Sequence, residues 1–297
     1  MTFEDFGHRF PPLSSTVQVE FGAQSRRGRA RAVNEDHYAI IRLGRHQETL
    51  FTSLSASSLS KRFDEYGYAM VVADGVGDTG VGETASRLAL ATLVELVRHF
   101  GKWNLRVDDL IAREILARAE RFYRHVDATV AYEGAVGPAL GLQTTLTSTF
   151  SAGRDLFFAH VGHSRAFLFR KRELLLLTRD HTIGSRGRSR LRPAPLVEVT
   201  AAARDLKHIL TETIGMGGLA GPTIDLERFQ IDDQDVILVC TNGLTDGVPE
   251  DVIAEVLASG APPERLCVEL ADLAETNTED DITVLMGRYH LNSPAPE

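Results

Sequence analysis

The sequence predicts an α+β fold in which strands and helices form a sandwich. Short apolar runs rich in β-branched residues begin or end in acidic or amide residues, which is typical of strands that reach the rim of a sheet. Two longer stretches, 82–97 and 107–131, repeat apolar residues every three or four positions, and this spacing predicts helices. Hydrophobic residues make up 43% of the 297 residues, which is enough for a sizeable core in one large domain or two small ones.

The first third of the chain is expected to contribute three strands. In the first, at 16–22, Val17, Val19 and Phe21 alternate with polar residues and share one face. A polar, Ser-rich insertion at about 44–66 separates the second strand from the third, and a loop of this length is expected to be either functional or disordered. The three predicted strands are 16–22, 38–41 and 70–73.

The rest of the chain adds helices and a series of closely spaced strands. Short polar breaks between apolar runs predict a β-meander after the two long helices. A basic segment at 178–192 follows the meander, either as a mobile flap that recruits anionic substrate or as an exposed linker. The later predicted strands are 144–150, 156–161, 166–170, 174–177, 223–231, 235–241 and 280–289, and the later helices are 249–258 and 262–274.

We expect one domain over 16–290, preceded by an irregular segment at 1–15 and followed by a short tail at 291–297. The formal net charge is −9, which argues against binding nucleic-acid phosphates. The two cysteines are too few for a disulfide framework and suit a reducing compartment. No apolar run approaches the length of a membrane span, and no basic segment followed by an apolar stretch opens the chain. These observations predict a soluble cytoplasmic protein without membrane partners.

Acidic or amide residues stand at one end of four predicted strands. The run 70–73 ends in Asp74 and Gly75, a pair that alone is typical of a plain turn. If neighbouring strands are antiparallel, the end of one lies beside the start of another, and the acidic ends can meet at one edge. Clustered carboxylates repel each other unless a cation or a proton lies between them. The pattern therefore predicts a metal centre, and the other strand ends involved are Asn34-Glu35-Asp36, Asn242-Gly243 and Asp280-Asp281.

These motifs resemble, in order and from about Val19 to Tyr289, the metal-dependent protein phosphatases of the 2C type. The resemblance implies two central antiparallel sheets flanked by helix pairs, with metals in a channel at one edge. It also implies metal-dependent hydrolysis of phosphoserine and phosphothreonine on proteins by a metal-activated water, and a cognate Ser/Thr kinase that the enzyme opposes. The motifs that carry it are Arg31–Asp36, Asp74–Asp78, Gly82–Ser86, Thr144-Thr145, Val161–Arg165, Leu177–His181, Asn242–Asp246 and Asp280–Val284.

By this resemblance, specific residues hold two cations and the phosphate. Asp74 would bridge both metals, Glu35 and the Gly75 carbonyl would serve one, and Asn242 and Asp280 would serve the other. Oxygen-only ligation suits Mg²⁺ or Mn²⁺. The two remaining residues assigned to the reaction are Asp36, which would hold metal-bound water, and Arg31, whose guanidinium fork fits a phosphate.

Three positions depart from the family pattern. Asn242 and His163 stand where the family usually has Asp, and Asp78 stands where it usually has a second Gly. An amide oxygen can coordinate a cation, but it lacks the negative charge, and Asp246 and Asp281 are close enough in sequence to compensate. His163 is expected to serve a weak third metal site, to donate a proton to the leaving oxygen, or to be a hydrogen-bonded turn residue.

The departures keep a second function open. A catalytically weak or inactive phosphatase-like module would bind a phosphoprotein or a kinase without turnover. A phosphatase that regulates a sigma factor is a related alternative. Metal-dependent turnover separates an enzyme from a binding module.

Overall fold

The computed structural model describes residues 17–54, 62–77, 80–102, 107–185, 209–217 and 220–291. The predicted segment 1–15, residues 292–297 of the predicted tail, residues 186–192 of the basic segment 178–192, and Asp78 lie outside these ranges. Within them, no helix is long and apolar enough to cross a membrane.

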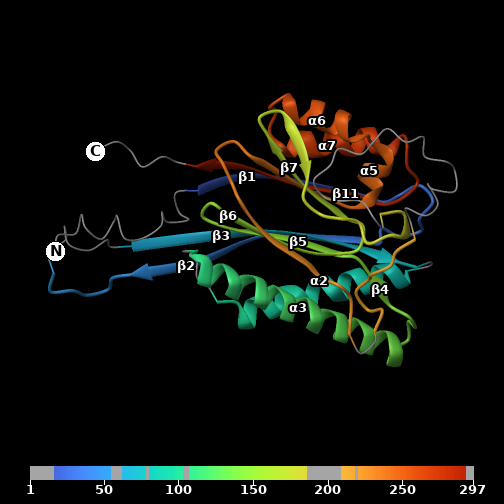
Figure 1. Ribbon diagram of the computed structural model, residues 1–297, viewed down its shortest axis with the longest axis horizontal. Helices are drawn as coiled ribbons and strands as arrows, with labels where there is room; N and C mark the ends of the chain where they lie inside the picture. Colours follow the sequence, from blue (N-terminus) through green and yellow to red (C-terminus); the bar gives the residue numbers. More distant parts are fainter. Residues whose placement is uncertain are drawn as a thin grey trace.

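Two antiparallel sheets pack face to face between helices, as the family resemblance implied (Figure 1). The first sheet has the order β1 (Val17–Arg26), β11 (Ile282–Leu291), β10 (Val236–Cys240), β7 (Arg165–Arg170) and β8 (Glu173–Leu176). The second has the order β2 (Asp36–Glu48), β3 (Arg62–Val76), β5 (Leu146–Ala152), β6 (Asp155–Val161) and β9 (Asp225–Gln230). A short strand, β4 (Gln143–Thr144), pairs with the end of β3.

Helices cover the outer face of each sheet. The long antiparallel pair α2 (Val81–Phe100) and α3 (Asp109–Val136) lies on the second sheet (Figure 1). The helices α5 (Asn242–Gly247), α6 (Glu250–Ala258) and α7 (Pro263–Glu275) lie on the first. A short 3₁₀ helix, η2 (Ile183–Ser185), follows the β7–β8 hairpin.

The uninterrupted apolar run 70–73 of strand β3 is explained by its burial on both faces. Val71 and Ala73 pack against the helix pair, whereas Met70 and Val72 pack between the two sheets. Because both faces of the strand are buried, polar residues cannot alternate along it. The continuous run that marks 70–73 in the sequence therefore belongs to a central strand whose end reaches one edge of the molecule.

In the described parts of the predicted Ser-rich insertion, 44–54 and 62–66, more residues lie in strands than in loop. Strands β2 and β3 extend into it as a hairpin whose register runs from Asp36 opposite Asp74 to Glu48 opposite Arg62. Pairing of β3 with β5 is confined to Gly67–Val72, so the outer part of the hairpin has two strands only. The side chains from Arg45 to Glu48 are exposed, and this exposure explains why the sequence there is polar.

Candidate metal centre

The predicted acidic strand ends meet at one edge of the two sheets. Asp36 opens β2 and lies directly opposite Asp74 near the end of β3. Asp280 precedes β11, and Asn242 opens α5 after β10. The antiparallel register of β2 and β3 therefore places two buried carboxylates side by side, and the first sheet supplies the other two residues.

Burial and mutual repulsion disfavour the ionised form of the carboxyl groups at this edge. Burial raises the pKa of Asp74 well above its usual value, and the neighbouring Asp36 and Asp280 raise it further. Burial likewise raises the pKa of Asp36 to about 7, although hydrogen bonds from Thr241 and Thr283 act in the opposite direction. The Thr241 hydroxyl donates to Asp36 Oδ2 at 2.8 Å, while Asp36 Oδ1 is buried without a hydrogen-bond partner.

Arg31 lies against two of the predicted metal ligands. Its Nη2 and Nε donate to Asp280 Oδ1 at 2.7 and 3.0 Å, and its Nη1 donates to Glu35 Oε2 at 3.1 Å. Nη1 is also 3.4 Å from the Gly77 carbonyl oxygen. The guanidinium thus offsets part of the negative charge at the edge of the sheets, at the place where the sequence predicted a phosphate ligand.

Glu35 and Gly75 are fixed by the start of α2. The Glu35 side chain is buried and accepts a hydrogen bond from the Gly80 amide at 3.1 Å, and its backbone carbonyl accepts one from the Gly75 amide at 3.1 Å. A Cβ on Gly75 would lie 2.1 Å from the carbonyl oxygen of Gly82. Glycine is therefore required at position 75 for the close approach of strand and helix.

Asp281 has a role that the sequence did not reveal. Its Oδ1 accepts the Gly28 amide and its Oδ2 accepts the Glu35 amide, both at 2.7 Å. The carboxylate therefore anchors both ends of the loop that carries Arg31 and does not replace the charge missing at Asn242. Because these bonds join residues about 250 positions apart, only the unexplained Asp-Asp pair could have signalled them.

The second residue expected to compensate does lie beside Asn242. The Asn242 amide donates to Asp246 Oδ2 at 3.2 Å and to Asp280 Oδ2 at 3.3 Å. Asp246 is one turn further along α5, a helix that the sequence analysis missed because six residues are too short to show a helical period. The amide nitrogen thus occupies the space between two carboxylates.

His163 is brought next to the centre. Its Nδ1 is 3.8 Å from Asp74 Oδ2, and both side chains are only 12% exposed. The next residue, Ser164, has its hydroxyl 3.0 Å from that of Thr145, which accepts the Asp74 amide at 3.1 Å. The turn after β6 therefore supports the backbone of Asp74 and places an imidazole at its carboxylate.

The donor set fits a hard divalent cation. It consists of carboxylates, one amide and a backbone carbonyl, and the unpartnered Asp36 oxygen together with the raised carboxyl pKa values indicates negative charge that Arg31 does not fully offset. Among the residues that the structure describes, no three His, Cys, Asp or Glu side chains are already gathered as a metal site. A cation would compete with Arg31 for Asp280 and Glu35.

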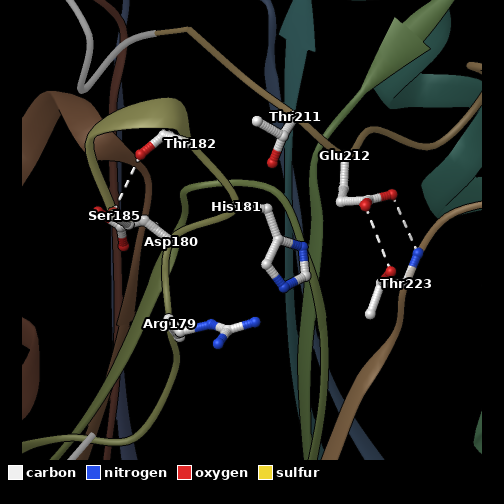
Figure 2. Close-up of a pocket in the computed structure, with 8 residues that line it drawn as sticks. All are labelled: Arg179, Asp180, His181, Thr182, Ser185, Thr211, Glu212 and Thr223. Carbon is white, nitrogen blue, oxygen red and sulfur yellow. Dashed lines mark hydrogen bonds between the residues drawn. The ribbon is translucent and has the colours of Figure 1, made fainter. Parts of the chain in front are cut away.

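A pocket of about 230 Å³ lies beside the turn that carries His163 (Figure 2). His181 projects into its centre, and Glu212 on its far wall holds the backbone amide and hydroxyl of Thr223 at 3.1 and 3.3 Å. The His181 amide donates to the Gly162 carbonyl at 2.7 Å. This last bond ties the loop after β8 to the turn and gives His181 a structural role.

A second histidine, His160, makes stability depend on pH. It is fully buried on β6, with Nδ1 2.8 Å from the Thr147 hydroxyl and its ring 4.9 Å from that of His181. Burial and, to a smaller extent, the neighbouring His181 lower its pKa to about 3. Below about pH 6.5 the His160 side chain is protonated in the unfolded chain, whereas in the folded chain it stays neutral down to about pH 3. The free energy of unfolding therefore decreases as the pH is lowered through this window.

Because of His160, we expect the free energy of unfolding to decrease by up to about 1.4 kcal/mol for each pH unit by which the pH is lowered between pH 6 and 4. Urea unfolding at pH 7, 6 and 5 should show a shallower pH slope for His160→Gln than for the wild type. His99→Gln, which replaces an exposed histidine on α2, should leave the slope unchanged. Equal slopes for both variants would rule out this assignment.

Comparison with known proteins agrees with the fold and with the chemistry of the edge. A family model described as protein phosphatase 2C matches residues 56–265. The serine/threonine phosphatase Stp of Listeria monocytogenes is 29% identical over 225 residues, which cover 73% of this chain and 82% of Stp. The serine/threonine protein phosphatase PstP of Mycobacterium tuberculosis is 27% identical over 294 residues, which cover 92% of this chain and 48% of PstP.

Solved structures share the fold. The serine/threonine phosphatase of S. agalactiae aligns with a TM-score of 0.70 at 23% identity, covering 91% of this chain and 99% of that one. The catalytic domain of PstP in complex with two manganese ions aligns with a TM-score of 0.66 at 25% identity, covering 92% and 99%. The relatives are named as enzymes, which favours a hydrolase over an inactive binding module. This chain therefore belongs to the protein phosphatase 2C family and removes phosphate from phosphoserine and phosphothreonine in proteins.

Proposed function

We propose that the reaction takes place at the edge where Asp36, Asp74 and Asp280 meet, and that two divalent cations bind there. The observation that carries this proposal is the register of β2 and β3, which sets two buried carboxylates with raised pKa values side by side. When bound, the cations would offset the charge of the phosphoryl group and lower the pKa of an attacking water.

The proposed ligands come from both sheets. Asp74 would contact both cations, because it lies at the centre of the acidic cluster. Glu35 and the Gly75 carbonyl, held together by the start of α2, would serve one cation. Asn242 and Asp280, which contact each other at 3.3 Å, would serve the other.

The remaining side chains would position water and phosphate. Asp36 keeps one oxygen free of hydrogen bonds while Thr241 holds the other, so Asp36 is suited to accept a hydrogen bond from water. Arg31 would exchange part of its contact with Asp280 for the phosphate, which its planar fork matches. His163, beside Asp74, would serve a third cation or protonate the leaving oxygen.

We infer that the cations are Mg²⁺ or Mn²⁺. The proposed donors are all oxygen atoms, which these ions prefer. A relative, the PstP catalytic domain, has been solved with two manganese ions. The neutral amide of Asn242 weakens the attraction for either ion relative to a carboxylate.

We also propose a biological setting. The substrates would be phosphorylated proteins, and a cognate Ser/Thr kinase would supply them. The free thiols of Cys240 and Cys267 are both buried, in keeping with a reducing cytoplasm. The segment 16–290 would form a single catalytic domain, since both sheets contain strands from the beginning and the end of this range.

Hydrolysis of a phosphothreonine peptide tests the proposed metal dependence. Purified protein should be inactive in EDTA and should recover turnover with Mn²⁺ or Mg²⁺. Isothermal titration of the metal-free protein with Mn²⁺ should show two binding events. Turnover that persists in EDTA, or a protein that binds neither ion, would contradict the proposed centre.

A further inference from the structure

The helix layer leaves a cavity of about 130 Å³ over the second sheet. The cavity lies between strands β2, β3 and β5 and the helices α2 and α3. Apolar side chains dominate its wall, and several of them are only half-buried although they lie between a sheet and its helices. Among these are Ile41, Val94, Val97, Ile115 and Phe122.

The size of this cavity suits a compact apolar group. An apolar protein cavity of about 150 Å³ accommodates a molecule such as benzene and stays free of water. The polar group deepest in the wall is already satisfied, because the Tyr123 hydroxyl bonds to Ser148 Oγ and to the Ala159 carbonyl, both at 2.8 Å. An occupant would therefore place an apolar body inside and any polar group at the opening.

The opening is positively charged. A second hollow, of about 420 Å³, adjoins the cavity, and Lys102, Arg118 and Phe122 line both. The outer hollow also contains Arg121 and Glu114, so three cationic side chains face one carboxylate. In a chain with a net charge of −9, this local excess of positive charge is unusual.

Arg118 is the least exposed of these three cationic side chains, and its partners lie at long distances. Its side chain is 14% exposed, and its ion pair with Glu114 is long, at 3.8 Å. It donates one long bond of 3.4 Å to the Lys102 carbonyl. Burial lowers the pKa of Arg118 against the attraction of Glu114, and the neighbouring Arg121 lowers it as well. An added anion could accept charge-assisted hydrogen bonds from the Arg118 guanidinium and stabilise its charge.

We propose that this cavity binds a small amphipathic carboxylic acid, with its apolar body between α2, α3 and the sheet and its carboxylate on Arg118. Charge complementarity decides between ligand classes. An alcohol would not offset the positive charge of Arg118, and the cationic side chains would repel an amine. The site is separate from the metal centre, which adjoins the opposite end of α2. The proposal does not depend on the identity of the bound cations.

Isothermal titration of the full chain with octanoate tests the carboxylate contact. We expect saturable binding by the wild type, and about a tenfold or greater loss in Arg118→Gln, since a buried charge-assisted bond is removed. Arg118→Lys should bind with intermediate affinity. Arg113→Gln, which removes an exposed arginine from the same helix, should bind as the wild type does.

The apolar part is tested separately by filling the cavity. Ala119→Leu should abolish octanoate binding while circular dichroism shows an unchanged fold, and Val94→Met provides a second filling variant from α2 if the first does not fold. Octylamine and octanol, which share the chain length, should bind far more weakly than octanoate. Absence of saturable octanoate binding, equal binding of octylamine, or equal effects of Arg118→Gln and Arg113→Gln would each overturn the proposal.

Discussion

Asp74→Asn should lower kcat on a phosphothreonine peptide by about a thousandfold. One unit of charge at about 4 Å and an effective dielectric constant of about 20 is worth up to about 4 kcal/mol, which corresponds to about three powers of ten in rate. Asp74 is the proposed common ligand, so both cations lose this attraction. The same substitution removes one of several mutually repelling buried carboxylates. We therefore expect the metal-free variant to resist urea at least as well as the wild type.

The combination of lost activity and retained stability distinguishes a catalytic role from a structural one. Asp155→Asn is the matched control, because Asp155 is also buried but pairs with Arg228 at the start of β6. This control should lose stability and keep most of its kcat. If Asp74→Asn retains more than about a tenth of the wild-type kcat under saturating Mn²⁺, Asp74 does not have the proposed role.

Asn242→Asp should tighten Mn²⁺ binding by tens-fold. Half of the same ~4 kcal/mol electrostatic term is about 2 kcal/mol, or a factor of about 30 in affinity. In the absence of metal the same substitution should be unfavourable and should lower the stability of the protein. The new carboxylate would face Asp246 and Asp280, to which the Asn242 amide now donates, and the metal-free variant should unfold at lower urea concentration.

Calorimetric titration with Mn²⁺ and urea unfolding in EDTA measure the two effects. Gln47→Glu serves as the control, because it adds the same charge at the exposed far end of β2. It should change neither quantity. Equal Mn²⁺ affinity in the wild type and Asn242→Asp would show that position 242 does not contact the cation.

The sequence was sufficient for the fold class and for the residues that gather at the sheet edge. Strands such as 70–73 are buried on both faces, and their apolar runs cannot be confused with surface segments. The hairpin of β2 and β3 was missed beyond residue 44 because its β2 arm is exposed from Gly44 to Glu48, and an exposed strand carries no apolar alternation.

The details of the site were less accessible for a different reason. The contacts of Arg31 with Asp280 and of Asp281 with two backbone amides join the two ends of the chain. Bonds of this kind leave no local period or spacing in the sequence. Motif order could therefore identify the residues, but it could not show that Arg31 lies on a carboxylate or that Asp281 anchors a loop.

The position of β11 has a consequence for biosynthesis. This strand lies between β1 and β10, and it follows directly after Asp280 and Asp281. At about 5–20 residues per second, a ribosome needs roughly 10–50 s to proceed from the end of β1 to the start of β11. Throughout that time β1 lacks its only neighbour in the described sheet, and Arg31 and Glu35 lack the carboxylates that hold them. A nascent chain thus cannot assemble the proposed centre until β11 has left the ribosome.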